Sequence, residues 1–253
     1  MLSVLVTALE RRQNAGMATT TPNASRTARD RARRELTEEI KRVARRHLAE
    51  HGSAALSLRA VAREVGMVSS AVYRYFPSRD DLLTALIIDA YDAVGERAEA
   101  AESASRDRGA DARWLSVCEA VRAWALANPH EYALIFGSPV PGYAAPEATI
   151  GPASRVPLVL LRLLGDGVAS GEFVAGKTPA MSRTTRSDFA QLRRTAAPAV
   201  PDAVLSRGLS VWAQLLGGIN LEMFGHLHNV IRDYDAFFTL QMRRACEFLT
   251  QGV

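Results

Sequence analysis

The segment from Ser57 to Arg79, SLRAVAREVGMVSSAVYRYFPSR, combines basic and hydroxyl side chains with a regular apolar spacing. Ser57 stands where the second predicted helix of the chain starts, so its hydroxyl can cap that helix, and the free amides beside it can bind a phosphate. Arg59 falls in the first turn, where a guanidinium can pair with guanine or stay exposed without a partner. Two short helices around Gly66 form a helix-turn-helix arrangement, which predicts contact with DNA.

The third predicted helix carries a second set of candidate DNA contacts. It begins at Ser69 and Ser70, whose short side chains let the backbone approach the floor of a major groove. Tyr73 and Tyr75 cannot both point into the core from so short a helix, so at least one hydroxyl is free to reach phosphate oxygens. Arg74 lies between them, on the groove side in this interpretation.

Helical patterns on both sides of this segment must position these groups. A first helix ends before Gly52, a second ends before Gly66, and a fourth starts after Pro77 with Ser78 as its N-cap. Their expected core faces follow the helical period and comprise Leu36, Ile40, Val43, Ala44 and Leu48, then Leu58, Val61, Ala62 and Val65, then Val72 and Phe76, and finally Leu82, Leu83, Leu86, Ile87, Ala90, Tyr91 and Val94.

Residues 33–95 resemble the DNA-binding domain of the TetR family, through the turn glycine, the aromatic run and the following basic residue at Gly66, Tyr73, Tyr75, Phe76 and Arg79. This resemblance implies a base contact by Arg59, phosphate contacts by both tyrosines, and a phosphate contact by Arg79 in place of the family's lysine. Val68 departs from the pattern, because the family often has a capping serine there, and Ser69 is then the alternative cap. The stretches NPHEYALIFG and WAQLLGGINLEMFG look like the regulatory domain of an actinobacterial-type branch of the family.

The charge of the chain is unevenly distributed. Residues 1–80 hold 15 Lys and Arg against 8 Asp and Glu, a net charge of +7, whereas the remainder has −3. This asymmetry favours a polyanionic partner for the N-terminal third, although a solvated basic surface is the alternative. Residues 18–30 have the composition of a flexible arm. This arm either enters the minor groove of DNA through its arginines or is disordered and only keeps its charges in water. The arginines in the arm and just after it are Arg26, Arg29, Arg31, Arg33 and Arg34.

The rest of the chain also has helical periodicity, and no segment is convincing as a strand. Further helices are expected near 111–127, 154–170, 203–227 and 233–250. The last two are apolar on two sides, which predicts either a homodimeric four-helix interface or burial within a monomeric bundle. The predicted fold is all-α, with a basic arm over 1–30, a helix-turn-helix domain over 31–78 and a regulatory domain over 79–253; residues 1–16 can also be a misassigned start before Met17.

A helical bundle with several aromatic residues is typical of a ligand-binding domain. The preferred wall residues are Trp124, Phe136 and Trp212, with Asn220 and Met223 on the same predicted helix as Trp212, although each can equally be ordinary core. Glu222 can orient a ligand, face solvent or pair with an arginine. A largely apolar small molecule is the expected ligand.

Motifs for other functions are missing. GDGVASG at 165–171 misses the dinucleotide-binding spacing, and no P-loop, HExxH or serine elbow occurs. His226 and His228 are two apart, which argues against a shared metal. No cofactor is expected, and the two cysteines and the absence of a long apolar run predict a cytoplasmic protein with no membrane contact.

The resemblance thus implies a dimeric repressor that leaves a palindromic double-stranded operator when a small ligand binds. The alternatives are a helix-turn-helix protein without an effector and, less in keeping with the sequence, a helical enzyme.

Overall fold

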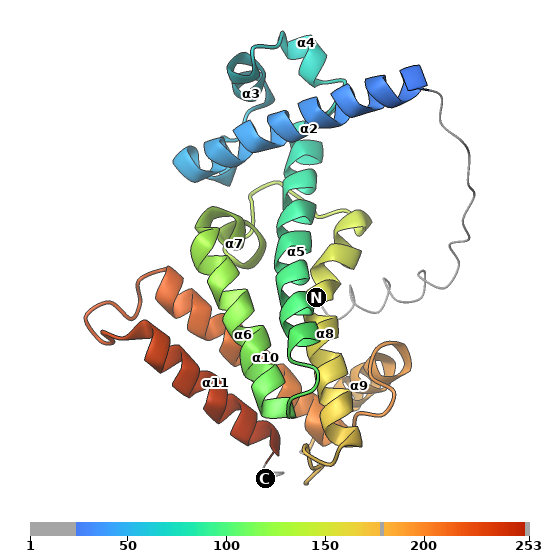
Figure 1. Cartoon of the computed structure of the whole chain (residues 1–253), viewed down its shortest axis with the longest axis vertical. Helices are drawn as coiled ribbons and strands as arrows, with labels where there is room; N and C mark the ends of the chain where they lie inside the picture. Colours follow the sequence, from blue (N-terminus) through green and yellow to red (C-terminus); the bar gives the residue numbers. More distant parts are fainter. Residues whose placement is uncertain (1–23, 178–179, 251–253) are drawn as a thin grey trace. The chain divides into compact units, whose positions relative to one another are not determined.

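The apolar periodicity of the sequence folds into a succession of helices in the computed structural model, which describes residues 24–177 and 180–250 (Figure 1). Within these residues there is no β-strand, in agreement with the all-α prediction. The α-helices are α2 (Ala24–His51), α3 (Leu58–Val65), α4 (Ser69–Val72), α5 (Arg79–Ala104), α6 (Ala110–Ala127), α7 (Pro129–Phe136), α8 (Ile150–Ala169), α9 (Arg183–Thr195), α10 (Asp202–Met223) and α11 (Tyr234–Thr250). Short 3₁₀ turns cover Ser53–Ala55 and Glu147–Thr149.

The described residues form two units according to their contacts. The head unit comprises residues 24–90 and 130–149, and the bundle unit comprises residues 91–129, 150–177 and 180–250. Helix α5 contributes its first half to the head unit and its second half to the bundle unit. The domain limits expected from the sequence, 31–78 and 79–253, stay a prediction.

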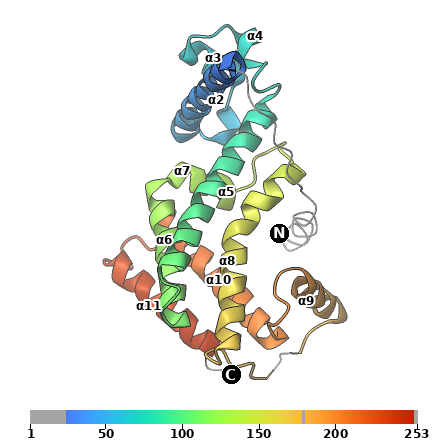
Figure 2. The same cartoon turned by 45° about the vertical axis from the view of Figure 1, so that its right-hand side comes forward.

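The core of the head unit contains most of the residues that the helical period predicts, whereas Leu36 and Val65 are only half-buried. In both views α3 and α4 lie on the same side of α2 (Figure 1, Figure 2). Ile40, Val43 and Ala44 of α2 are almost fully buried, as are Val61 of α3 and Val72 of α4. Because burying each of these valine and isoleucine side chains contributes about 1.5–3 kcal/mol, this apolar contact holds the short helices in place.

Helix α2 begins earlier than its apolar pattern indicates. Residues 24–30, which we expected to belong to a flexible arm, are helical, and residues 1–23 lie outside the described part of the chain. The sequence ASRTARDRARRE has no apolar stripe, but it consists largely of Ala, Arg and Glu, which have high intrinsic helix propensity. High intrinsic helix propensity therefore continues α2 toward the N-terminus, beyond the residues that are buried.

Helix α7, which the sequence did not predict as a helix, joins the head unit through polar contacts. Arg45 of α2 pairs with Glu131 of α7, with 2.9 Å between Nε and the carboxylate, and also with Asp89 of α5. In the segment that follows α7, the Tyr143 hydroxyl lies 2.9 Å from the Thr84 hydroxyl. Residues 130–149 are thus tied to both α2 and α5 within this unit.

The bundle unit is built around α6, α8, α10 and α11, which lie in the expected regions. Helix α11 packs against both α6 and α10. The buried indole of Trp114 on α6 donates a hydrogen bond to the Met242 carbonyl of α11 over 2.8 Å. Helix α9, which the sequence did not predict, buries only Phe189 and Leu192, so its apolar signal is weak. No helix of the described residues is long and apolar enough to span a bilayer.

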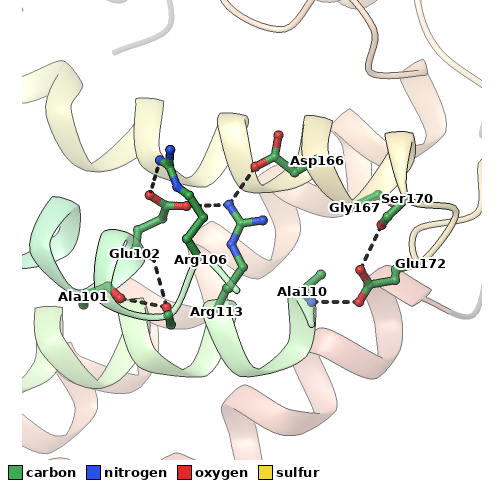
Figure 3. Close-up of polar contacts among 10 residues, drawn as sticks. Ala101, Glu102, Arg106, Ala110, Arg113, Asp166, Gly167, Ser170 and Glu172 are labelled. Atoms are coloured by element: carbon green, nitrogen blue, oxygen red, sulfur yellow. Dashed lines mark hydrogen bonds and ion pairs between the residues drawn. The ribbon is translucent and has the colours of Figure 1, made fainter. Parts of the chain in front are cut away.

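A cluster of charged side chains joins α5, α6 and α8 inside the bundle unit. Figure 3 shows the Glu102 carboxylate between the guanidinium groups of Arg106 and Arg113. Arg113 also reaches Asp166 over 2.7 Å, and Glu102 and Arg113 are both buried. Burial raises the pKa of Glu102, but the hydrogen bonds from the two arginines outweigh it, so the pKa is lowered below its ordinary value of 4.5.

We expect Glu102→Gln to lower the free energy of unfolding by about 1–3 kcal/mol, because a charge-assisted hydrogen bond is lost inside the protein. A group with a depressed folded-state pKa stabilises the fold above its unfolded pKa and loses that contribution as the pH falls. The wild type should therefore lose stability below about pH 4.5 more steeply than the variant. Urea unfolding at pH 7 and pH 4 measures both effects.

The matched control is Glu96→Gln on the same helix, since Glu96 is exposed and lies 3.9 Å from its arginine. Equal losses for the two variants would mean that the buried cluster has no special contribution to stability.

Candidate nucleic-acid interface

Helix α3 is held at both ends by the residues that the sequence indicates. The Ser57 hydroxyl oxygen accepts a hydrogen bond from the Ala60 amide at 3.5 Å, which confirms its prediction as an N-cap. Gly66 ends the helix with φ 79° and ψ 22°, a left-handed conformation that glycine adopts without strain. The next residue, Met67, donates its amide to the Ala62 carbonyl over 2.8 Å. These contacts define the turn between α3 and α4.

The side chains proposed to contact bases lie exposed on α3 and α4. Arg59 is exposed in the first turn of α3, and Ser69 and Ser70 are exposed in the first turn of α4. Tyr73 and Arg74, directly after α4, are also exposed. Their opposite side is buried through Val72 and Phe76, as the spacing predicts. Helices α3 and α4 and the residues just after α4 therefore present hydrogen-bonding groups to solvent.

Tyr75 has a different environment from Tyr73. The guanidinium carbon of Arg33 lies 5.4 Å from the centre of the Tyr75 ring, and Arg33 also donates a hydrogen bond to the Arg74 carbonyl at 3.3 Å. Tyr75 is half-buried as a result. Arg33, an arginine of the predicted basic arm, thus supports the residues that follow α4, and its entry into a minor groove stays a prediction. Tyr73 is the better placed of the two hydroxyls for a phosphate.

Arg79 connects α5 to the turn before α3. Its Nη2 donates to the Ser53 carbonyl over 2.8 Å and its Nε to the Leu56 carbonyl over 3.2 Å. The side chain also pairs with Asp80. Arg79 thus has a structural role that the sequence did not reveal, in addition to the phosphate contact that the family resemblance implies.

The remaining cations of the head unit divide into paired and unpaired groups. The ion pairs with carboxylates are Lys41 with Glu38 and Asp89, Arg42 with Glu39, Arg45 with Asp89 and Glu131, and Arg46 with Glu64. Over residues 24–177 and 180–250, no such pair is present for Arg59, Arg63 or Arg74. Arg63 is exposed one turn after Arg59 on the same face of α3. It is a candidate phosphate contact that sequence reasoning missed, although its spacing of four from Arg59 was a usable signal.

The five proposed ligand-binding residues are not all in one unit. Trp124 is buried on α6, whereas Trp212, Asn220 and Met223 are half-buried on α10. Phe136 ends α7 in the head unit, with its ring centre 5.2 Å from that of Tyr132. Of the three alternatives for Glu222, the ion pair is the one observed: both carboxylate oxygens lie 2.7 Å from nitrogens of Arg122.

Two open grooves of the bundle unit lie elsewhere. One, of about 650 Å³, is formed by α6 and α11 and lined by residues such as Asp111, Glu119, Arg243 and Glu247. The other, of about 480 Å³, is lined by Arg106, Arg162, Asp166 and the segment between α9 and α10. None of the five proposed residues lines either groove. Within the described ranges, no group of three or more His, Cys, Asp or Glu could hold a metal ion.

The fold and the exposed face of α3 and α4 are those of a helix-turn-helix DNA-binding protein. Two family models match the chain: that of bacterial regulatory proteins of the tetR family over residues 40–86, and that of the tetracycline repressor-like C-terminal domain over residues 114–245. The chain therefore belongs to the TetR family of DNA-binding transcriptional regulators.

Individual relatives agree with this assignment. The HTH-type transcriptional regulators Rv1816 of Mycobacterium tuberculosis and Mb1846 of Mycobacterium bovis are each 40% identical to the chain over 218 residues, which is 84% of this chain and 91% of theirs. The crystal structure of the regulatory protein SCO4313 is 32% identical, covers 89% of this chain and 98% of that one, and has a TM-score of 0.69. The fatty acid degradation regulator FadR from Bacillus halodurans, 16% identical with a TM-score of 0.54 over 85% of this chain and 98% of its own, shares the fold.

Proposed function

We propose that this chain is a cytoplasmic repressor that binds a palindromic operator as a homodimer and is released by a small, largely apolar ligand. The observation that carries the operator part is the exposed Arg59 guanidinium, which has no carboxylate partner in the described residues. It stands on a helix whose start is capped by Ser57, beside the exposed first turn of α4. A positioned arginine that is not neutralised is suited to bidentate recognition of guanine.

The operator is tested by selecting bound sequences from a random pool of duplexes with the ligand-free protein. We expect a palindromic consensus with half-sites about one helical turn or slightly more apart, because a two-fold dimer presents two recognition helices. Affinity for the consensus should fall steeply with salt. Enrichment of no sequence, or of a single non-palindromic half-site, would contradict the operator proposal.

The homodimer is supported by apolar surface on α10, on α11 and directly after α10. Leu221, Phe224, Leu240 and Phe248 each expose 40% or more of their surface. On α10, a Cβ atom added at Gly217 would meet open space, so a partner helix can approach this part of the backbone closely. Exposed apolar side chains on two adjacent packed helices are typical of a subunit interface.

Release by a ligand is supported by the connection between the units. Helix α5 belongs to both of them, and the chain also passes between them at residues 129–130 and 149–150. A ligand that binds one state of the bundle unit better than another can therefore bias the head unit through continuous backbone.

We expect that a ligand found by a thermal-shift screen weakens operator binding about 5- to 150-fold, which corresponds to a coupling free energy of about 1–3 kcal/mol. Reciprocity requires the operator to weaken ligand binding by the same factor. Calorimetric titration of the ligand with and without operator measures this factor. Equal ligand affinity in the two titrations would mean that the molecule is not the inducer. A screen without any binder would favour the alternative, a helix-turn-helix repressor without an effector.

A further inference from the structure

Val68, at the start of the recognition helix α4, is an apolar side chain in a position that ordinarily favours a polar one. It is the N-cap residue of α4, with φ −66° and ψ 141°, and it makes no side-chain capping hydrogen bond. Serine, threonine, asparagine or aspartate at an N-cap would stabilise the helix by about 1 kcal/mol relative to an apolar residue. The chain thus forgoes a local stabilising contact at this residue.

Val68 is also unusually exposed for an apolar residue. It is 71% exposed, a fraction that only Val230 equals among the exposed large hydrophobic residues of the described chain. Val72 at the end of this helix and Phe76, four residues after Val72, are both buried. Val68 therefore contributes little to the core of the head unit, and its side chain is available to a partner.

The immediate surroundings of Val68 are those of the DNA-facing surface. Ser69 and Ser70 follow it directly and are exposed. Arg59 on α3 and Arg74 just after α4 are also exposed, have no carboxylate partner within the described ranges, and add positive charge to this helix-turn-helix segment. The partner that fits a small apolar group within such a basic and hydroxyl-rich surface is the edge of a base pair. Small neighbouring side chains allow a close approach to that edge.

The major groove offers an apolar group of matching chemistry, the C5 methyl group of thymine. Valine cannot donate or accept a hydrogen bond, so it cannot distinguish bases through their polar edges. We propose that Val68 recognises a thymine C5 methyl group at one position in each operator half-site. This inference rests on the binding of an operator by α3 and α4, and it adds a specificity-determining residue to that site.

The test replaces each thymine of the selected operator by deoxyuridine, which removes the methyl group and leaves the base-pairing edge unchanged. For the wild-type protein, we expect one thymine position per half-site at which this replacement weakens binding about fourfold, because one buried methylene-sized group contributes about 0.8 kcal/mol. When the thymines of both half-sites are replaced, binding should be about 15-fold weaker. For Val68→Ala, the thymine and deoxyuridine operators should bind equally at that position.

Two further variants separate methyl recognition from folding. Val68→Ser provides the missing cap, so its thermal stability should be at least that of the wild type while its discrimination between thymine and deoxyuridine is lost. Val230→Ala removes an equally exposed valine from the connection between α10 and α11, and it should retain the full discrimination. A duplex with 5-methylcytosine at the sensitive position should bind the wild type about fourfold better than one with cytosine there, because it carries the same methyl group.

Equal binding of thymine and deoxyuridine operators by the wild type at every position would overturn the assignment of Val68, as would discrimination that persists in Val68→Ala. Either result would leave the operator itself established. Failure of the wild type to bind any duplex specifically would instead overturn both the proposed operator and the role of Val68.

Discussion

Arg59→Ala is expected to weaken binding to the selected operator by about 1–3 kcal/mol per half-site. For the two half-sites of a palindrome this corresponds to about 30- to 20,000-fold. The loss of base preference should be confined to one base pair in each half-site, where the variant accepts other bases that the wild type rejects. The physical reason is that Arg59 is exposed in the first turn of a capped helix and has no carboxylate partner in the part of the chain that the structure describes. Binding titrations against all single-base variants of the operator measure both effects.

Two other arginines provide the comparison. Arg42 is exposed on α2 but is paired with Glu39, so Arg42→Ala should change operator affinity little. Arg79→Ala should weaken all sequences alike and reduce the salt slope by about one unit per lost phosphate contact. Because Arg79 also donates to the Ser53 and Leu56 carbonyls, its loss should lower thermal stability as well. An unchanged base preference in Arg59→Ala would show that Arg59 is not a base reader.

Leu240→Glu is expected to convert a homodimer into a monomer at micromolar concentration and to weaken operator binding by about 10²- to 10⁴-fold. The proposed dimer face loses a half-exposed leucine and gains a charge that would have to be desolvated against the partner. The operator loses the effective concentration that links its two half-sites. Sedimentation velocity gives the mass, and titration of the full operator and of a single half-site gives the binding loss. Affinity for the isolated half-site should be unchanged.

Leu126→Glu is the matched control, since Leu126 is a leucine of similar exposure on α6. It should remain a dimer. Leu216, which lies on the apolar stripe of α10, is a less suitable test: a charge there is also expected to dissociate the dimer, but the side chain is half-buried and the substitution would disturb the fold of the single chain. A dimeric Leu240→Glu protein, or equal dissociation of the two glutamate variants, would place the interface elsewhere.

The head of this protein could be predicted from sequence because its signals are local. Ser57, Gly66 and Ser78 mark helix ends through contacts within three or four residues, and the apolar spacing of α2 to α5 identifies the buried faces. The aromatic run after α4 adds a family resemblance, which the comparisons confirm. Helix α7 was missed because it has only eight residues and buries only Tyr132, and α9 was missed because it is predominantly polar and buries only Phe189 and Leu192, so few apolar residues mark either helix.

By itself, therefore, the sequence determined the all-α fold, the two helices of the DNA-binding motif and the exposed residues at their starts. Only the tertiary structure decided which arginines have long-range partners. Arg79 reaches carbonyls 23 and 26 residues away, and Arg113 meets Asp166 at a separation of 53 residues. Such pairs depend on how helices distant in sequence pack together, and a charged residue has no periodic signature that reveals its partner. Within residues 24–177 and 180–250, the same long-range packing leaves Arg59 without a carboxylate partner and Val68 exposed to solvent. These two residues carry the predictions about specificity.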